Sequence, residues 1–417
     1  MLDSPPGGLH AAGVTEDVEL LIAGGGLTGL MLGVVCAGAG LEVAVVDRQE
    51  PAAMQEGQFD GRSSAIAYGS QNVLDAIGLW PELAGHAEPI REIRVADDSS
   101  PLFLHYDHRE LGTLTPLGYI VENHLLRRAL FHYASSLSTL TLLAPLEVGS
   151  VLPSAHATAV MLSDGRQVRA RLVAAADGWR SPLRHASGIG AVEWPYPQTG
   201  IVTTVRHEAP HRGIAIEHFL SAGPFAILPM TGNRSSIVWT ERAELAPRIM
   251  KLCESAFAKE LTVRFGDFLG TVEPGGPRWS YPLGLMIAEA YVAPRLALVG
   301  EAAHMIHPIA GQGLNLSIRD IAALAELLID TRRLGLDIGS ESVLQRYERW
   351  RRFDVVALAA VTDGLNRLFS NSLPIVQLAR DFGLAAVHRL PPLKRLLMRD
   401  AMGLVGDLPR LVRGQPL

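Results

Sequence analysis

Residues 18–47 form the stretch VELLIAGGGLTGLMLGVVCAGAGLEVAVVD, which decides the fold. Val18–Ala23 is apolar on both faces, which is typical of a buried parallel strand. It runs directly into Gly24–Gly29, which fits the pattern G-x-G-x-x-G. We expect a helix to about Gly40 and a second strand over Glu42–Val46. Strand, glycine turn, helix and strand in this order predict a dinucleotide-binding unit.

Each glycine of the turn has its own steric task. Gly24 permits the tight turn, Gly26 lets the backbone approach a pyrophosphate, and Gly29 lets the helix lie close to the strand. Thr28 lies inside the turn and joins the candidate cofactor residues. Asp47 ends the second strand, where a carboxylate can accept hydrogen bonds from adenosine ribose hydroxyls. The alternative for Asp47 is a solvated acid at a strand end.

Composition and charge limit the class of protein. The chain has 417 residues, 48% of them apolar and 19% charged, which is enough for two domains or one elaborate one. A net charge of −6 without a large basic block argues against nucleic acid as a partner. Only Cys36 and Cys253 are present, far apart in sequence, so we expect no disulfide framework and a reducing compartment.

Two N-terminal features bear on localisation. Residues 1–17 contain no Lys or Arg, so they lack the basic region of a secretory signal, and we expect a disordered tail on a cytoplasmic protein. Leu20–Leu41 carries no charge and is long enough for a membrane span. Its seven glycines favour a strand, a turn and a buried helix instead, so we predict no span there.

Two further segments carry arginines that could reach a cofactor. Arg62 precedes a run of small residues and a predicted helix, and it could bind a phosphate or a flavin carbonyl or lie on a surface loop. Residues 121–131, VENHLLRRALF, predict a helix that contains Arg127 and Arg128. Adjacent helical residues do not share a face, so we expect at most one of the two to point at a ligand.

A second candidate motif lies in residues 172–188, LVAAADGWRSPLRHASG. An apolar strand ends there at Asp177-Gly178. Asp177 could hold a cofactor hydroxyl, and Gly178 would bring the backbone near the cofactor. Since Asp-Gly is also a common turn dipeptide, an ordinary turn is the alternative.

The third candidate motif is residues 296–320, LALVGEAAHMIHPIAGQGLNLSIRD. We expect a short buried strand that ends at Gly300, then Pro308, the loop Gly311–Gly313, and a helix from Leu314. Unpaired N–H groups and the helix dipole at such a start suit an electron-rich ligand, such as a reduced flavin ring or a pyrophosphate. An ordinary strand-turn-helix connection is the alternative.

His304 and His307 lie in the same stretch, three residues apart. The second histidine precedes a proline in a turn, which is unlike a helical pair of metal ligands, so we expect no metal site.

The pattern of apolar and polar residues in the rest of the chain suggests how the domains are arranged. Ile201–Pro282 contains short alternating segments that are typical of an antiparallel sheet with one face covered. We predict an α/β (α+β composite) fold: a Rossmann-like nucleotide-binding domain, an inserted antiparallel-sheet substrate domain and C-terminal helices. The predicted limits are a tail at 1–17, the nucleotide domain at 18–75, 111–185 and 283–340, the substrate domain at 76–110 and 186–282, and the helical region at 341–417.

The C-terminal region is basic and interleaved with leucine and methionine. Its basic residues are Arg389, Lys394, Arg395, Arg399, Arg410 and Arg413. A basic amphipathic tail could lie on an anionic membrane surface, or it could pack on the protein with its basic face in water. The sequence leaves both possibilities open.

The segments GGGLTGL, AADGWRSPLR and GEAAHMIHPIAGQGLNLSIRD occur in the order and spacing of the class A, single-component flavoprotein aromatic hydroxylases. Within that class the chain resembles the ubiquinone-biosynthesis hydroxylase family. The segments GPFAILPM and TDGLNRLFSN, together with the C-terminal run, extend the resemblance over nearly the whole chain from Val18.

The resemblance implies roles for individual residues. It places Gly24, Gly26 and Gly29 at the FAD pyrophosphate and Asp47 at the adenosine ribose. Arg62, and Arg127 or Arg128, would approach the cofactor. Asp177 and Gly178 match a DG motif that serves FAD and the nicotinamide donor. Glu301 takes the place of the usual aspartate near the ribityl chain. The residues expected around the isoalloxazine ring are Pro308, Gly311, Gln312, Gly313 and Asn315, and Leu314 is a further expected cofactor-binding residue.

The resemblance also implies the chemistry. It implies FAD, NAD(P)H as reductant and O2 as co-substrate, with an oxygen atom passing from a flavin C4a-hydroperoxide to the ring of a polyprenylated phenol in ubiquinone biosynthesis. Contact with a ubiquinone-biosynthesis complex and with the inner face of the cytoplasmic membrane are further expectations. The rival interpretations are a related hydroxylase of a soluble aromatic compound and a non-catalytic flavin-binding subunit.

Overall fold

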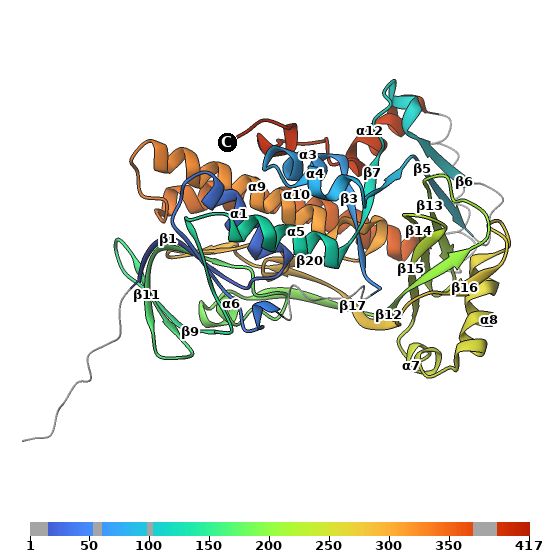
Figure 1. Cartoon of the computed structure of the whole chain (residues 1–417), viewed down its shortest axis with the longest axis horizontal. Helices are drawn as coiled ribbons and strands as arrows, with labels where there is room; N and C mark the ends of the chain where they lie inside the picture. Colours follow the sequence, from blue (N-terminus) through green and yellow to red (C-terminus); the bar gives the residue numbers. More distant parts are fainter. Residues whose placement is uncertain (1–15, 53–60, 98–102, 370–389) are drawn as a thin grey trace, which may run out of the picture.

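The computed structural model describes residues 16–52, 61–97, 103–369 and 390–417, so most of the expected tail lies outside it. A layer of helices lies on one sheet, and a second sheet stands at the other end of the molecule (Figure 1). The long strands β12 (Ala191–His207) and β17 (Trp279–Ala288) run along one side of the molecule to the second sheet (Figure 1).

The first sheet is built around β1 (Glu16–Ala23). Its order is β18-β19-β11-β1-β2-β8, and β1 pairs in parallel with β11 (Gln167–Ala175) and β2 (Val43–Val46). Leu20 to Ile22 are fully buried, which confirms the predicted buried parallel strand. Its other strands are β8 (Leu140–Leu143), β9 (Val148–Pro153), β10 (Thr158–Leu162), β18 (Val292–Ala293) and β19 (Leu296–Leu298).

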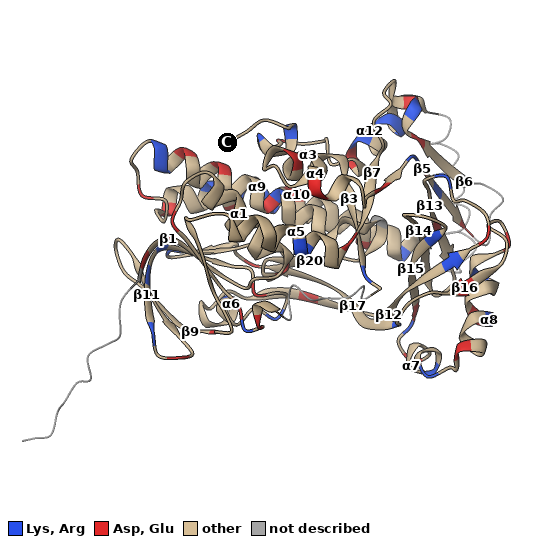
Figure 2. Cartoon of the chain, in the orientation of Figure 1, with Lys and Arg blue, Asp and Glu red and all other residues tan. Residues whose placement is uncertain are grey.

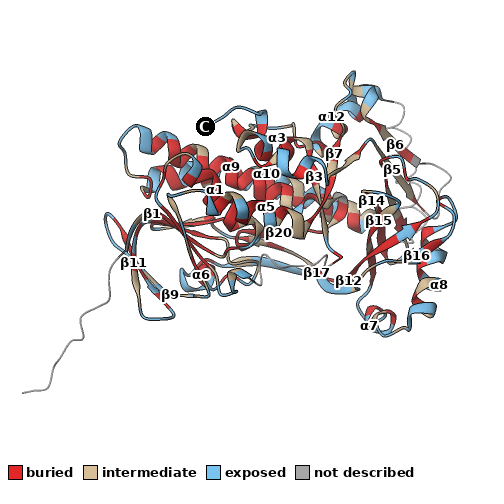
Figure 3. Cartoon of the chain, in the orientation of Figure 1, coloured by how far each residue is buried: buried red, intermediate tan, exposed pale blue. Residues whose placement is uncertain are grey.

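Helices cover this sheet and carry much of the buried surface (Figure 3). α1 (Leu27–Gly38) packs against both α9 (Gln312–Arg333) and α5 (Asn123–Ser135), and α9 packs against α10 (Glu341–Phe369). Nine of the twelve residues of α1 are buried, because Gly29 and Gly33 let it lie close to the strands. The apparent membrane span is thus divided between β1 and α1. Among the helices within the described ranges, none has both the length and the apolar character needed to cross a bilayer.

The second sheet has the order β20-β17-β12-β15-β14-β13-β5-β6. Its neighbours are antiparallel except β13 and β5, which run in parallel. One face packs on α7 (Ala246–Met250) and α8 (Glu254–Phe265) through residues such as Phe225, Trp239 and Phe257. Its remaining strands are β5 (Glu92–Asp97), β6 (Phe103–Asp107), β13 (Ile214–Leu220), β14 (Gly223–Met230), β15 (Arg234–Arg242), β16 (Val272–Pro274) and β20 (His304–Met305).

Local boundaries differ from the sequence expectation in three places. The small residues after Arg62 form a strand, β3 (Ser63–Ala67), in a third sheet with β7 (Gly118–Glu122) and β4 (Glu88–Ile90). Since Val121 and Glu122 complete β7, α5 begins at Asn123 rather than at Val121. α9 begins at Gln312, two residues before the predicted start, because the end of the glycine loop is already helical.

The remaining elements are short, apart from α12 in the C-terminal region. They are α3 (Tyr68–Ala76), α4 (Trp80–Ala84), α6 (Pro182–Ala186), α12 (Pro391–Ala401), η1 (His108–Leu111), η2 (Gly300–Ala302), η3 (Ile309–Gly311) and η4 (Leu411–Arg413). The domain limits stay a prediction, and the one at 282/283 falls inside β17.

Candidate functional site

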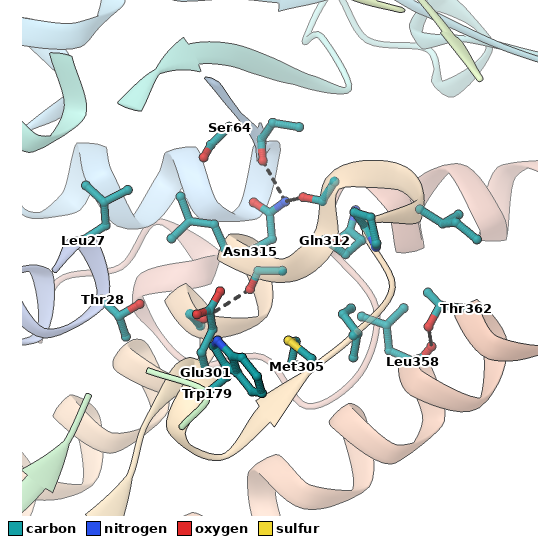
Figure 4. A pocket seen from close by; sticks show the side chains of 18 of the residues that line it. Leu27, Thr28, Ser64, Trp179, Glu301, Met305, Gln312, Asn315, Leu358 and Thr362 are labelled. Carbon is teal, nitrogen blue, oxygen red and sulfur yellow. Dashed lines mark hydrogen bonds between the residues drawn. The ribbon is translucent and has the colours of Figure 1, made fainter. Parts of the chain in front are cut away.

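One large cavity, with a volume of about 2120 Å³, runs between the first sheet, the helices and the second sheet. The predicted site residues that line it are Gly24, Gly26, Thr28, Asp47, Arg62, Arg127, Asp177, Gly178, Glu301, Pro308, Gly311, Gln312, Gly313, Leu314 and Asn315. Figure 4 shows Thr28, Glu301 and Asn315 around this pocket, each from a different segment of the chain. The structure therefore brings together three motifs that lie far apart in sequence.

The glycines of the turn have two different roles. Gly24 and Gly29 are needed for packing, whereas Gly26 leaves space for a ligand. Gly24 has a φ of +102°, and its N–H donates to the carbonyl oxygen of Val46 at 2.8 Å, which fixes the turn against β2. A Cβ on Gly29 would lie 1.8 Å from the carbonyl oxygen of Gly24, so Gly29 is needed for packing. A Cβ on Gly26 would meet no protein atom within 4 Å and would project into the cavity region. Gly26 is thus the position where space is kept free of protein.

Asp47 organises the turn from the end of β2. Its Oδ2 accepts a hydrogen bond from the N–H of Gly25 at 2.6 Å, and its Oδ1 accepts one from Gln49 at 2.8 Å. Each carboxylate oxygen has a second acceptor site. The side chain can therefore fix the backbone and still accept a hydrogen bond from a ligand hydroxyl.

Asp177 follows β11 and offers an unused acceptor. Its Oδ2 accepts a hydrogen bond from the N–H of Leu183 at 3.2 Å, whereas its buried Oδ1 has no hydrogen-bond partner. Burial raises the pKa of this carboxyl, against the opposing effect of Ser181 and Leu183. A buried acceptor without a partner costs free energy, so a ligand donor beside Asp177 would stabilise it.

Asn315 ties the third motif to β3. Its side-chain NH2 donates to the carbonyl oxygens of Ala65 at 2.9 Å and Gly311 at 3.1 Å, and its Oδ1 accepts from the N–H of Ala67 at 2.8 Å. The amide is therefore engaged with backbone, and it fixes the Gly311 loop against the strand that follows Arg62. A Cβ on Gly313 would meet no protein atom within 4 Å, as at Gly26.

The two predicted arginine sites are now distinguished. Arg127 is half-buried and lines the cavity, whereas Arg128 is exposed and does not line it. The two arginines therefore lie on different faces of α5, and only Arg127 faces the cavity. Arg62 also lines the cavity, and its guanidinium carbon lies 5.5 Å from the ring centroid of Trp279.

Asp320 is an important residue that sequence reasoning missed. This fully buried acid of α9 accepts a hydrogen bond from the N–H of Gly300 at 3.1 Å, lies 2.6 Å from Nε2 of His304 and accepts one from Nε of Arg351 at 2.7 Å. Burial raises its pKa, but His304 and Arg351 outweigh that effect and hold the pKa below its usual value. Asp320 thereby fixes the turn that presents Glu301 to the cavity. An acid inside an apolar helical run was the available signal.

His304 and His307 take separate roles. His304 belongs to the Asp320 cluster, whereas His307 is fully buried against Tyr196, with a ring-centroid distance of 5.3 Å. Neither nitrogen of His307 has a hydrogen-bond partner, and burial lowers its pKa to about 4. His307 is therefore a neutral packing residue next to Pro308 at ordinary pH.

The other end of the cavity contains none of the three candidate cofactor motifs, although β14 is the segment GPFAILPM that shares the family resemblance. The second sheet presents alternate residues to it, among them Val95, Ala226, Leu228 and Val238, and α10 contributes Leu358. These positions are apolar members of ordinary strands and a helix. Sequence reasoning assigned none of them to the site, because their role comes only from the packing of distant segments.

The cofactor end fits FAD on structural grounds. It combines glycines whose missing side chains leave open space, the N-terminus of α1 and the unpaired Oδ1 of Asp177. The family described as FAD binding domain matches residues 17–361. Ubiquinone hydroxylase UbiL of Rhodospirillum rubrum is 52% identical over 402 residues, which cover 96% of this chain and 93% of that protein.

The chain belongs to the ubiquinone-biosynthesis flavin hydroxylases. It is an FAD-dependent aromatic-ring monooxygenase. Two other members are 3-demethoxyubiquinol 3-hydroxylase of Escherichia coli, 34% identical over 93% of this chain and 99% of that protein, and the mitochondrial ubiquinone biosynthesis monooxygenase COQ6 of Homo sapiens, 31% identical over 92% of each chain.

Solved structures support the fold of this hydroxylase. The p-nitrophenol 4-monooxygenase PnpA from Pseudomonas putida superposes with a TM-score of 0.78, covering 94% of this chain and all of that one, at 19% identity. PqsL from Pseudomonas aeruginosa superposes with a TM-score of 0.73 over 85% of this chain and 97% of that one, at 24% identity. At these identities the likeness establishes the fold alone.

Proposed function

We propose that this hydroxylase adds a hydroxyl group to the ring of a polyprenylated phenol. The observation that carries the proposal is the shape of the cavity, which joins the cofactor end to an apolar end. Its volume of about 2120 Å³ is roughly twice the upper range of about 300–1,000 Å³ that is usual for a small-molecule site. FAD and a long apolar substrate can therefore occupy it together.

We propose that the predicted residues hold FAD as follows. The glycine turn and the start of α1 face the pyrophosphate, with Asp47 at the adenosine ribose and the free Oδ1 of Asp177 at a cofactor hydroxyl. The side chain of Glu301, which is exposed to the cavity, reaches the ribityl chain. The loop Gly311–Gly313 faces the isoalloxazine ring. These assignments are supported by the shared cavity and by the open space above the glycines.

When bound, FAD passes electrons from NAD(P)H to O2 and delivers one oxygen atom to the aromatic ring. The task of the chain is to bind and orient both partners and to exclude water. The N-terminus of α9 stabilises negative charge beside Gly313 through its dipole. The apolar wall of β14, β15 and α10 keeps the ring and the prenyl chain dry.

The rival proposal is a soluble aromatic substrate. A small hydroxylated ring would leave most of the apolar wall in contact with water, so the wall favours the prenylated substrate.

The two substrates are distinguished by two measurements on one protein. We expect the purified protein to be yellow, and cells that lack the gene to accumulate a prenylated phenol with one hydroxyl too few. The missing oxygen then identifies the ring position. A yellow protein with an unchanged quinone pool would favour the soluble substrate, and a protein that cannot be reconstituted with FAD would overturn both proposals.

We also propose that α12 lies on an anionic membrane surface. Lys394 and Met398 of this helix are buried toward the protein, whereas Leu393 and Leu396 are 37% and 52% exposed beside the exposed Arg395. The ribbon of α12 carries blue Lys and Arg positions in Figure 2. An apolar ridge next to arginines fits the boundary between acyl chains and acidic headgroups.

Two of the basic residues expected on such a surface are committed to the protein instead. Lys394 lies 2.6 Å from Glu110, and Arg410 lies 2.6 Å from Asp330. Arg389 lies outside the described residues. The surface therefore depends on Leu393, Leu396 and the arginines of α12 rather than on the whole tail.

Vesicle sedimentation tests the membrane proposal. Leu396→Ser should reduce binding to vesicles of phosphatidylglycerol and phosphatidylcholine about tenfold. Leu334→Ser is the control and should not reduce it, because Leu334 is a 73% exposed leucine outside α12. Equal binding by both variants would overturn the proposal.

A further inference from the structure

Glu217 is a carboxyl residue in the otherwise apolar wall of the substrate end. It lies on β13, where it pairs with Val95 of β5 and Ala226 of β14, and Ala226 pairs in turn with Val238 of β15. All four residues line the cavity. An acid in the middle of such a row is costly unless a ligand uses it.

The position of Glu217 relative to the flavin loop follows from its two neighbours on the same face. Phe219 packs with Leu104 and Ile309, the residue after Pro308. Ala215 belongs to a cluster that includes Ala65 of β3, and a Cβ on Gly311 would lie 2.9 Å from the Cβ of Ala65. Glu217 stands between these two contacts.

It therefore faces the Pro308–Gly313 loop from the opposite wall. The ring of a substrate that lies against the flavin would lie between this loop and the wall.

The carboxyl of Glu217 has no hydrogen bond or ion pair with any group in the described part of the chain. Protein surrounds it, and the surface that it keeps faces the cavity. Burial raises its pKa to about 8. The neighbouring cavity positions on β14 and β15 are Ala226, Leu228 and Val238, and none of them can donate a hydrogen bond through its side chain.

We propose that Glu217 binds the ring hydroxyl of the phenolic substrate and takes up its proton during hydroxylation. This inference rests on the proposed function, because it needs a phenol in the apolar end of the cavity. It makes Glu217 a catalytic residue that touches the substrate.

The proton balance is simple. The phenolic O–H bond breaks, its proton moves to an Oε of Glu217, and the electron pair on oxygen raises the electron density of the ring. The ring then forms a C–O bond to the oxygen atom that the flavin delivers. The displaced ring proton is released, and the phenolate oxygen regains its proton from Glu217. O2 is the oxidant and NAD(P)H the reductant, so the second oxygen atom leaves as water.

The acidity of Glu217 suits this step. A phenol has a pKa of about 10 and an ordinary Glu one of about 4.3, whereas burial brings Glu217 to about 8. The proton therefore moves across a gap of about 2 pH units instead of about 6. The raised pKa of Glu217 is caused by its burial in the apolar wall.

Other titratable groups surround the same space and must be separated from Glu217 in any pH profile. Tyr106 of β6, Arg319 of α9, Asp354 of α10 and Asp400 of α12 line the cavity, and Asp97 extends β5 beside Phe219. Glu217→Gln leaves all of them in place.

The test compares Glu217→Gln with wild type, as FAD-loaded full-length protein, on a short-chain prenylated phenol. We expect normal FAD content and continued NAD(P)H oxidation, but about a hundredfold less hydroxylated product per second, with KM changed much less than kcat. Product formation by wild type should rise as the pH approaches 8, and that rise should be absent in Glu217→Gln. Glu193→Gln is the matched control, because Glu193 is an exposed acid at the same cavity.

A binding measurement keeps the two proposals separable. The methyl ether of the same phenol lacks the hydroxyl, and its binding can be followed through the flavin absorption. Wild type should bind the phenol about tenfold more tightly than the ether, and Glu217→Gln should bind the two alike. Retained preference and retained turnover in Glu217→Gln would overturn the role of Glu217. Absence of hydroxylation by wild type with preference intact would overturn the proposed function alone.

Discussion

The two ends of the cavity are built in different ways. The cofactor end is made of short contiguous motifs, in which backbone groups and missing side chains do most of the work: Gly24–Gly29, Asp177-Gly178 and Gly311–Gly313. The substrate end is made of single side chains from at least four strands and a helix, among them Val95, Ala226 and Leu358. The shape of the cofactor end is determined by the path of the backbone. The shape of the substrate end is determined by the side chains that pack between the strands and the helix.

This difference teaches which changes each end tolerates. At the cofactor end one added methyl group changes the ligand space directly, because no side chain stands between backbone and cofactor. At the substrate end one side chain is a small part of a wide apolar wall. A substitution that fills space should therefore weaken FAD binding at the cofactor end and, by a smaller factor, substrate binding at the substrate end.

The largest effect should come from the cluster beneath the cofactor end. Asp320→Asn removes the carboxylate that the buried side chains of Arg351 and His304 share, and it leaves Arg351 paired with Asp354. Breaking such a pair costs about 3–5 kcal/mol, so we expect the free energy of unfolding to fall by that amount. Urea denaturation of the apoprotein measures it. The exposed pair Arg166–Asp164 is the control, where Asp164→Asn should leave the free energy of unfolding almost unchanged.

Gly26→Val tests whether the open space at the cofactor end is reserved for FAD. A Cβ at this position meets no protein atom within 4 Å, so the fold should survive while FAD affinity falls about a hundredfold, or about 3 kcal/mol. Gly29→Val should instead disturb the fold itself, because its Cβ would overlap the carbonyl oxygen of Gly24. FAD titration and circular dichroism distinguish the two. If the purified Gly26→Val protein kept its full FAD content, the assignment of Gly24–Gly29 to the cofactor site would be wrong.

The buried residue His307, which precedes Pro308, should make the free energy of unfolding depend on pH. Its pKa is lowered to about 4 by burial, so the unfolded chain, with a His pKa of about 6.5, binds the extra proton first. Stability is therefore full above about pH 6.5 and declines by about 3 kcal/mol as the pH falls to about 4. His307→Phe should flatten this part of the profile. Thermal denaturation from pH 7.5 to 4.5 is the measurement, and an unchanged slope would contradict the assignment.

Ala226→Phe fills the substrate end in the way that Gly26→Val fills the cofactor end. We expect unchanged FAD binding and an increase in KM for a prenylated phenol of about thirtyfold, or about 2 kcal/mol. FAD content and steady-state kinetics report the two quantities separately. Loss of FAD from this variant would show that a side chain at the substrate end also affects cofactor binding.

The smallest effect should come from the arginine pair on α5. Arg127→Ala should weaken FAD binding about tenfold, or about 1.4 kcal/mol, because Arg127 lines the cavity. Arg128→Ala removes the same charge from the exposed neighbour and should change nothing. An equal loss of FAD affinity in the two variants would show that the positive charge of α5 matters and the position of Arg127 does not.

The sequence singled out the segments that the structure brings together at the cofactor end, because their signals are local. A glycine pattern, a strand-end acid and a Gly-Gln-Gly loop each keep their meaning within a few residues. The substrate end could not be predicted residue by residue, since Glu217 and Ala226 are ordinary members of alternating strands until β5, β13 and β14 lie side by side. Asp320 was missed for a related reason: its partners Gly300, His304 and Arg351 come from other elements.

The continuity of the cavity has a thermodynamic consequence. In the proposed arrangement FAD occupies one end of a shared space, so its ring would form part of the wall that the phenol contacts, and the phenol would cover a face of the flavin. Each ligand should then raise the affinity of the protein for the other, and linkage requires the two factors to be equal. A variant that loses its flavin loses its substrate pocket with it, and a saturating substrate should help a weakened variant retain its flavin.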